Sequence, residues 1–168
     1  MGSTPRAFLP GIGLRPGGER PDLEPFVVAA FAALYESVAA HARVGLNVVV
    51  DVGHHDAYSR PLGILRASAE RLRGLPAWLV GVRCPLETVL ARRSESGYLS
   101  APAPDATPEP ILRWQDEVHR PGIYDFEVDT SVLDPSAAAA VIRRQVEAGP
   151  LPSAFERILG LPVSDRKR

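Results

Sequence analysis

The run AWLVGVRCPLETVLARR, residues 77–93, decides the fold class. Its first part, residues 77–84, is almost wholly apolar, which is typical of a strand buried on both faces of a parallel sheet. The part from Pro85 onward predicts a helix, because proline is favoured in a first turn and cations such as Arg92 and Arg93 are favoured in a last turn. A buried strand followed at once by a helix indicates an α/β fold.

The same alternation continues in both directions along the chain. Upstream, apolar residues at four-residue spacing predict a helix over 25–44, and the β-branched run LNVVVDV predicts a buried strand over 46–52. The other expected elements are helices over about 59–73, 111–118 and 135–148, and a strand over 126–128. Strands separated by helices of this length imply a parallel sheet flanked by helices, with right-handed crossovers.

The expected organisation has three parts. Residues 1–24 are rich in glycine and proline, without apolar periodicity, and are expected to be irregular. Residues 25–148 are expected to form a single α/β domain, in which the proline-rich stretch at about 94–112 is either a mobile lid or a linker. Residues 149–168 are expected to be a tail with one short helix near 153–159.

Composition limits the classes of function. A chain of 168 residues with a formal net charge of −1 is an ordinary single domain, with no field for capturing nucleic acid or an anionic membrane surface. Cys84 is the only cysteine, which excludes an internal disulfide or a multi-cysteine metal site and favours the cytoplasm. No stretch approaches the roughly 18 apolar residues of a membrane span, so no membrane partner is expected.

Lysine is almost absent from this sequence. Of 19 basic side chains only Lys167 is a lysine, which excludes a Schiff base or a phosphate-binding lysine within the fold. The glycine-rich run GIGLRPGG at 11–18 does not form a nucleotide loop, because no strand precedes it, Pro16 opposes a following helix and no lysine follows it.

Polar side chains are expected at the carboxyl ends of the strands, where parallel sheets bind ligands. The segment DVGHHDAYSR, 51–60, brings Asp51, His54 and His55 to such an end. An acid with imidazoles can orient a hydroxyl, act as a general base or hold a metal ion. A polar substrate-binding loop is our first interpretation. A solvated loop without function and a metal-dependent hydrolase remain open, although no second cluster has the spacing of a known zinc motif.

Arginines surround the proline-rich stretch. Arg92 and Arg93 precede it, and Arg113 and Arg120 follow it. Converging guanidinium groups would clamp a phosphate and stabilise charge during phosphoryl transfer. The alternative is that they lie on solvated helix faces, because this chain uses arginine where others use lysine. Cys84, with no histidine nearby in sequence, is interpreted as a buried structural thiol.

Three segments, GLNVVVDVGHHD, WLVGVRCPLETVLARR and WQDEVHRPGIYDFEVDTS, resemble in order and spacing the chloramphenicol phosphotransferase-like proteins, a branch of the P-loop kinase fold. The resemblance covers about residues 25–148. It implies a five-stranded parallel sheet and transfer of the γ-phosphate of ATP, with Mg²⁺, to a hydroxyl of a small molecule. It places Asp51 and the GHHD loop at the acceptor pocket, Arg92 and Arg93 at the lid entry, and Asp129, Thr130 and Ser131 near the adenine.

The sequence departs from the family pattern at its start and in the lid. Family members begin with a strand, a GxxxxGK[ST] loop, a helix and a second strand ending in an aspartate base, and none of these occurs in this sequence. The RGDR-like lid run is replaced by SESGYLSAPAP. We therefore expect a truncated member, inactive as given, whose Met1 lies inside a longer protein. A degenerate paralogue and a non-catalytic small-molecule-binding or interaction protein are the alternatives.

The family's first strand lies at the centre of its sheet, between the strands matched here by 46–52 and 77–84. Its absence leaves two possibilities for this chain. Either these two segments pair directly, or two apolar strand edges stay open and favour a homodimer or aggregation.

Overall fold

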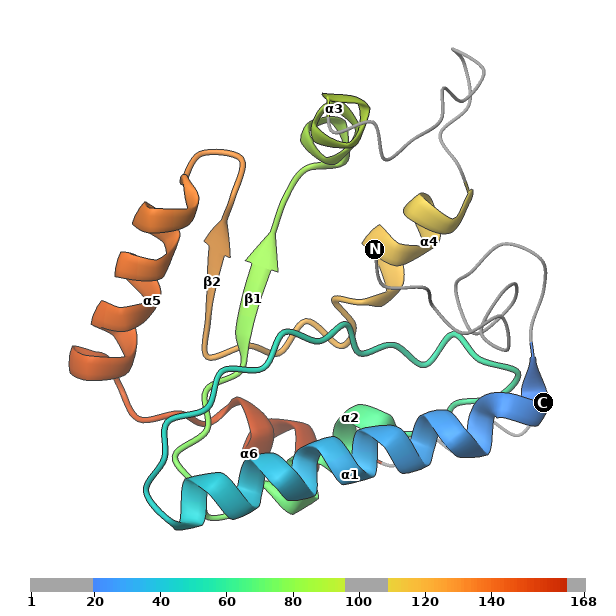
Figure 1. Cartoon of the computed structure of the whole chain (residues 1–168), viewed down its shortest axis with the longest axis vertical. Coiled ribbons are helices and arrows are strands. Elements are labelled where there is room, and N and C mark those ends of the chain that lie inside the picture. The colour runs from blue at the N-terminus through green and yellow to red at the C-terminus, as the bar shows by residue number, and fades with distance from the viewer. Residues whose placement is uncertain (1–19, 96–108, 163–168) are drawn as a thin grey trace.

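The computed structural model describes residues 20–95 and 109–162, and all structural statements below concern these residues. The elements in chain order are a 3-10 turn Pro21–Leu23, α1 Glu24–Arg43, α2 Ile64–Arg71, β1 Val80–Arg83, α3 Leu86–Glu95, α4 Glu109–Glu117, β2 Phe126–Asp129, α5 Pro135–Ala148 and α6 Ala154–Leu159. Figure 1 shows β1 and β2 in the middle of the molecule, with α5 beside β2 and with α1, α2 and α6 gathered at one end. Most of the predicted lid lies outside the described residues.

The two strands form a parallel sheet in which Val80 stands opposite Phe126 and Arg83 opposite Asp129. The predicted α/β class, with a parallel sheet flanked by helices, is confirmed. Because side chains alternate along a strand, Val80 and Phe126 share one face, on the side of the buried Val128, while Arg83 lies on the other. β1 and β2 therefore end together at one edge.

The predicted strand over 46–52 is wrong. The N–H of Leu46 donates to the carbonyl of His41, and residues 47–52 make no backbone-to-backbone hydrogen bond within the described part of the chain. A strand exists only through pairing with a neighbour. Within the described residues no strand lies beside this segment, and Val49 is 98% exposed. The five-stranded sheet is reduced to two strands in the described ranges, and direct pairing of this segment with β1 does not occur.

The helices follow the local signals of the sequence. α1 has Pro25 in its first turn and is followed by Gly45, whose φ of +83° suits the left-handed turn that ends the helix. α5 has its predicted span, and its N-cap Asp134 accepts the N–H of Ala137 at 2.9 Å. α2 begins later than predicted, because Gly63 before it has a left-handed φ of +64°, which a right-handed helix cannot include.

The core lies where α1, α2 and α6 meet. It is built from six buried side chains: Tyr35, Ala39, Ala69, Leu72, Phe155 and Ile158. The short helix α6, which the sequence analysis placed in a tail, thus contributes to this core. Because four of the ten buried apolar residues of the described chain are alanines, the core is thin.

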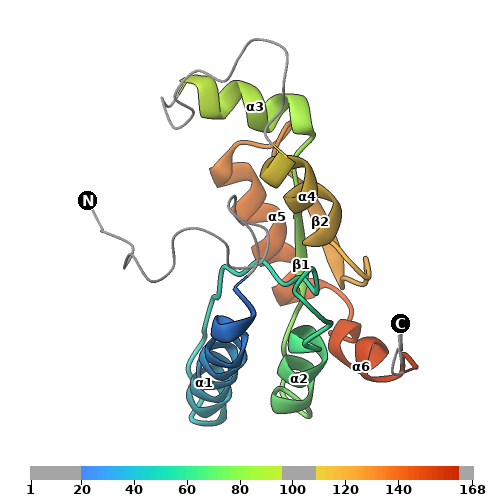
Figure 2. The ribbon, with the colours of Figure 1, turned by 90° about the vertical axis from the view of Figure 1, so that its right-hand side faces the viewer.

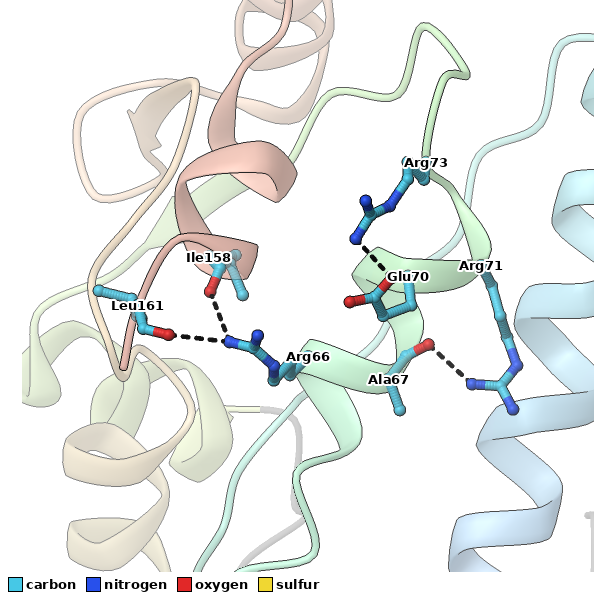
Figure 3. Close-up of polar contacts among 7 residues, drawn as sticks. All are labelled: Arg66, Ala67, Glu70, Arg71, Arg73, Ile158 and Leu161. Atoms are coloured by element: carbon cyan, nitrogen blue, oxygen red, sulfur yellow. Dashed lines mark hydrogen bonds and ion pairs between the residues drawn. The ribbon is translucent and has the colours of Figure 1, made fainter. Parts of the chain in front are cut away.

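Two arginines of α2 make polar contacts with the neighbouring helices α6 and α1. Figure 3 shows Arg66 pointing from α2 to the end of α6, where it donates to the carbonyls of Ile158 at 3.5 Å and Leu161 at 2.9 Å. The carbonyl of Ile158 already accepts the N–H of Leu161 at 3.2 Å, so Arg66 adds a second donor there and also binds the carbonyl of Leu161 just after the helix. On the other side, the guanidinium of Arg71 lies 3.2 Å from the carboxylate of Glu36 on α1.

α1 with its preceding turn, Pro21–Arg43, is long and apolar enough to cross a membrane by length and composition, which the sequence analysis did not expect. One side of this helix packs in the core through Tyr35 and Ala39. Glu24, at its start, is buried and accepts both the N–H and the hydroxyl of Ser59. A helix that packs in the core of a soluble protein passes the same test, so the finding is weak support for a membrane span.

Candidate functional site

The turn after β2 is fastened to the end of β1. The N–H and the hydroxyl of Thr130 both donate to the carbonyl oxygen of Arg83, at 2.9 and 3.0 Å. The carboxylate of Asp129 accepts from the hydroxyl and the N–H of Ser131, and these bonds lower the pKa of Asp129. The turn predicted to lie near the adenine is thus held by hydrogen bonds at the edge where parallel sheets bind ligands.

Arg92 of α3 reaches the same turn. Its guanidinium donates to the carbonyl oxygen of Thr130, and lies 3.5 Å from the hydroxyl of Thr130 and 3.6 Å from the sulfur of Cys84. The structure thereby joins two groups that the sequence suggested separately, the arginines before the proline-rich stretch and the turn after the last strand. A guanidinium has five N–H groups, so Arg92 can hold the turn and still present donors to an anion.

The two other predicted phosphate ligands lie on different helices. Arg93 follows Arg92 on α3 and is half-buried, whereas Arg113 lies on α4 and is exposed. Both interact with other groups of the chain. Convergence of these three arginines on one phosphate stays a prediction.

His54 is turned toward α1 and buried. Its Nε2 lies 2.8 Å from the hydroxyl of Tyr35, and its ring centroid lies 5.5 Å from that of Phe31. Burial lowers the pKa of His54 to about 4, the charge of His55 acts in the same direction, and Asp56 opposes them. Burial also raises the pKa of Tyr35. Both partners are therefore uncharged at neutral pH, and this pair holds the loop on α1.

His55 is turned toward α4 instead. Its ring stacks on Tyr58, with centroids 4.4 Å apart, and meets the edge of Trp114 at 5.9 Å. Burial lowers the pKa of His55, against the opposing charge of Asp56. The Nδ1 atom of His55 is buried without a hydrogen-bond partner. Gly53 is required beside this cluster, because a Cβ there would lie 2.6 Å from the Trp114 ring.

The three predicted acceptor residues therefore do not form one cluster. Asp51 is exposed, while the imidazoles of His54 and His55 contact different helices. Two imidazoles that diverge in this way do not converge on one ion, and no group of three metal-ligating side chains occurs in residues 20–95 and 109–162. The metal-dependent hydrolase gains no support from this arrangement.

A polar network on one face of the sheet was not among the predicted site residues. His119 Nδ1 lies 2.8 Å from the Tyr124 hydroxyl, and the Arg83 guanidinium lies 5.4 Å from the Tyr124 ring centre. Arg83 also pairs with Glu127 at 2.6 Å. Gln115 of α4 donates to the carbonyl of Cys84 just beyond β1. The signal was the VHRPGIYD run, which places a histidine and a tyrosine five residues apart.

A cavity of about 20 Å³ lies beside His54, bounded on its other side by Tyr124 and Ile123. This volume holds about one water molecule. This cavity is too small for a substrate.

A family model described as chloramphenicol phosphotransferase-like protein matches residues 3–147, which is most of the chain. The chain belongs to this family. Comparisons with curated proteins and with solved structures give no match. Membership of the chloramphenicol phosphotransferase-like family confirms the resemblance carried by the three segments and relates the chain to phosphotransferases. The mixed α/β architecture with a small parallel sheet is consistent with a P-loop kinase-like fold.

Proposed function

We propose that this chain carries the acceptor loop and part of the nucleotide side of a small-molecule O-phosphotransferase, which moves the γ-phosphate of ATP to a hydroxyl. The observation that supports it is the contact between Arg92 and Thr130 at the shared end of β1 and β2, in a chain of a phosphotransferase-like family. Guanidinium groups stabilise the charge that spreads over the phosphate oxygens during transfer.

The acceptor side of the proposal is the loop that contains Asp51 and His55. His54 has a positioning role, because its bond to Tyr35 holds the loop on α1. Since burial lowers the pKa of His55, its imidazole is uncharged near neutral pH and is able to accept a proton from a hydroxyl. A small hydroxylated molecule therefore fits this loop chemically.

The residues fit a nucleotide better than they fit Mg²⁺. Arg92 and the hydroxyl groups of Thr130 and Ser131 suit the anionic and polar parts of ATP, whereas Asp129 is the single carboxylate of that turn. The sequence has no GxxxxGK[ST] loop, and its lone lysine is Lys167. Because phosphoryl transfer depends on positive charge around the phosphates, we propose that the chain as given binds ATP weakly and does not transfer phosphate by itself.

A second candidate is a non-catalytic protein that binds a small molecule through the Asp51–His55 loop. The absence of a lysine-bearing glycine loop from this sequence favours it. The two candidates differ in whether ATP binds at all.

Calorimetry with Mg²⁺-ATP and the full chain tests the proposal. We expect weak binding, and we expect Arg92→Ala to weaken it about tenfold, because a charged contact to the nucleotide is lost. Arg143→Ala is the matched control, since Arg143 on α5 pairs only with the exposed Glu147 among the described residues. Circular dichroism of each variant checks that the fold is intact.

Absence of binding by the unaltered chain would contradict the phosphotransferase proposal and favour the non-catalytic candidate. Equal binding by the unaltered chain and by Arg92→Ala would show that the nucleotide is not at this edge. A loss in Arg143→Ala as large as that in Arg92→Ala would point to nonspecific attraction between arginines and phosphates.

A further inference from the structure

The outer side of α1 and the segment that follows it expose many apolar side chains. Of the 27 residues from Phe26 to Val52, 18 are exposed. The large apolar side chains among them are Phe26, Val28, Leu34, Val44, Leu46, Val48 and Val49. Large exposed apolar patches on soluble proteins mark interaction sites.

The backbone of the segment that follows α1 makes few hydrogen bonds among the described residues. Residues 47–52 donate and accept no backbone-to-backbone hydrogen bond in the described part of the chain. Figure 2 shows the segment leaving α1 along the outer side of the molecule with no strand beside it. Valines at 48, 49 and 50 favour an extended conformation, and no charged residue lies between Arg43 and Asp51. Such a segment is a template for pairing with another strand.

We propose that this surface binds a second copy of the chain, with residues 47–51 of the two copies paired as antiparallel strands about a two-fold axis at Val49. A two-fold axis perpendicular to the two paired strands makes identical segments run antiparallel. Each copy then contributes the same surface to the interface. A stable interface takes about 20–30 residues from each partner. Up to 18 exposed residues of Phe26–Val52 are available for that contact.

The register follows from hydrogen bonding and charge. The N–H groups of Val44, Gly45 and Leu46 are already bound to carbonyls of α1, so pairing begins at Asn47. An axis at Val49 places Val48 opposite Val50, and Asn47 opposite Asp51. The Asn47 amide can then donate to the Asp51 carboxylate, and the two Asp51 side chains lie at opposite ends of the pair. An axis at Asp51 would instead set two carboxylates against each other, which is destabilising.

Sedimentation velocity of the full chain over a range of concentrations tests this interface. We expect a monomer–dimer equilibrium, and we expect Val49→Lys to raise the dissociation constant at least tenfold, because two ammonium groups would meet at the axis. Val132→Lys is the matched control, since Val132 is 78% exposed in the turn after β2. It is expected to leave the dissociation constant unchanged.

The register has its own test. Asn47→Asp sets carboxylates opposite each other at both ends of the pair and is expected to raise the dissociation constant about tenfold. Adding Asp51→Asn to that variant exchanges the two side chains and is expected to restore the dimer. Failure of this rescue would overturn the register. A monomer at every concentration, open-ended oligomers, or an equal effect of Val132→Lys would overturn the interface itself.

Discussion

Asp125→Ala is expected to lower the free energy of unfolding by about 3 kcal/mol, because one carboxylate satisfies three backbone N–H groups. Its Oδ1 accepts the N–H of Ser153 at 2.6 Å and of Ala154 at 2.9 Å, at the start of α6. Its Oδ2 accepts the N–H of Leu79 at 2.8 Å, just before β1. Asp125 therefore links α6 to the beginning of the sheet.

The cost of this substitution follows from how α6 begins. Ser153 is the N-cap of α6, but its side chain makes no capping hydrogen bond. Asp125 takes the place of the cap from a different part of the chain, where a carboxylate is also favoured by the helix dipole. Each lost bond to this half-buried carboxylate is worth about 1 kcal/mol, and the freed N–H groups gain no other partner from alanine.

Urea denaturation followed by circular dichroism measures the effect. Asp116→Ala is the matched control, because Asp116 is an exposed aspartate that pairs with Arg120 and should change the unfolding free energy by less than about 0.5 kcal/mol. Asp125→Asn keeps one acceptor oxygen and is expected to fall between the two. Equal stability of the Asp125→Ala and Asp116→Ala variants would show that α6 is held by apolar packing alone.

The helix α1 could be predicted from its own residues, whereas the conformation of residues 46–52 could not. α1 and α5 were predicted because helical hydrogen bonds close within the helix, and the signals that start and stop them are local, such as Asp134 at the start of α5. A strand depends on a partner that its own residues do not specify, so LNVVVDV could not be assigned by its composition. For the same reason the place of α6 was not predicted, since it depends on the distant Asp125 and Arg66.

The residue types of the candidate site could be predicted from the sequence, but the contacts between their side chains could be predicted less well. The sequence suggested Arg92 as a lid residue and Thr130 as part of the turn near the adenine, but it did not predict that the two would be in contact, as they are in the structure. The divergence of His54 and His55 toward α1 and α4 depends on how the helices pack around the loop. This packing involves residues far apart in the sequence. The adjacency of His54 and His55 therefore suggested one cluster, although their side chains contact different helices.

The burial of His54 predicts that acid destabilises the protein. The pKa of His54 is about 4 in the folded chain, whereas an unfolded histidine titrates near its ordinary pKa of 6.5. Between these values the unfolded chain binds more protons, so stability falls as the pH falls. The contribution of His54 is fully present above the unfolded pKa and is lost as the pH approaches 4, which amounts to about 3 kcal/mol. Charging the imidazole would also place a cation in the apolar surroundings of Phe31.

Urea denaturation at a series of pH values from 7 to 4 measures this loss. His54→Gln removes the titrating group and is expected to flatten most of the pH dependence while lowering stability at pH 7, because the bond to Tyr35 is altered. His41→Gln is the control, since it replaces an exposed histidine of α1 whose Nδ1 lies 2.7 Å from the carbonyl oxygen of Ser37 on the same helix. Burial also lowers the pKa values of His55 and His119, so some slope of the same sign should remain in His54→Gln. A full slope in that variant would assign the acid sensitivity to those two histidines and leave His54 without a part in it.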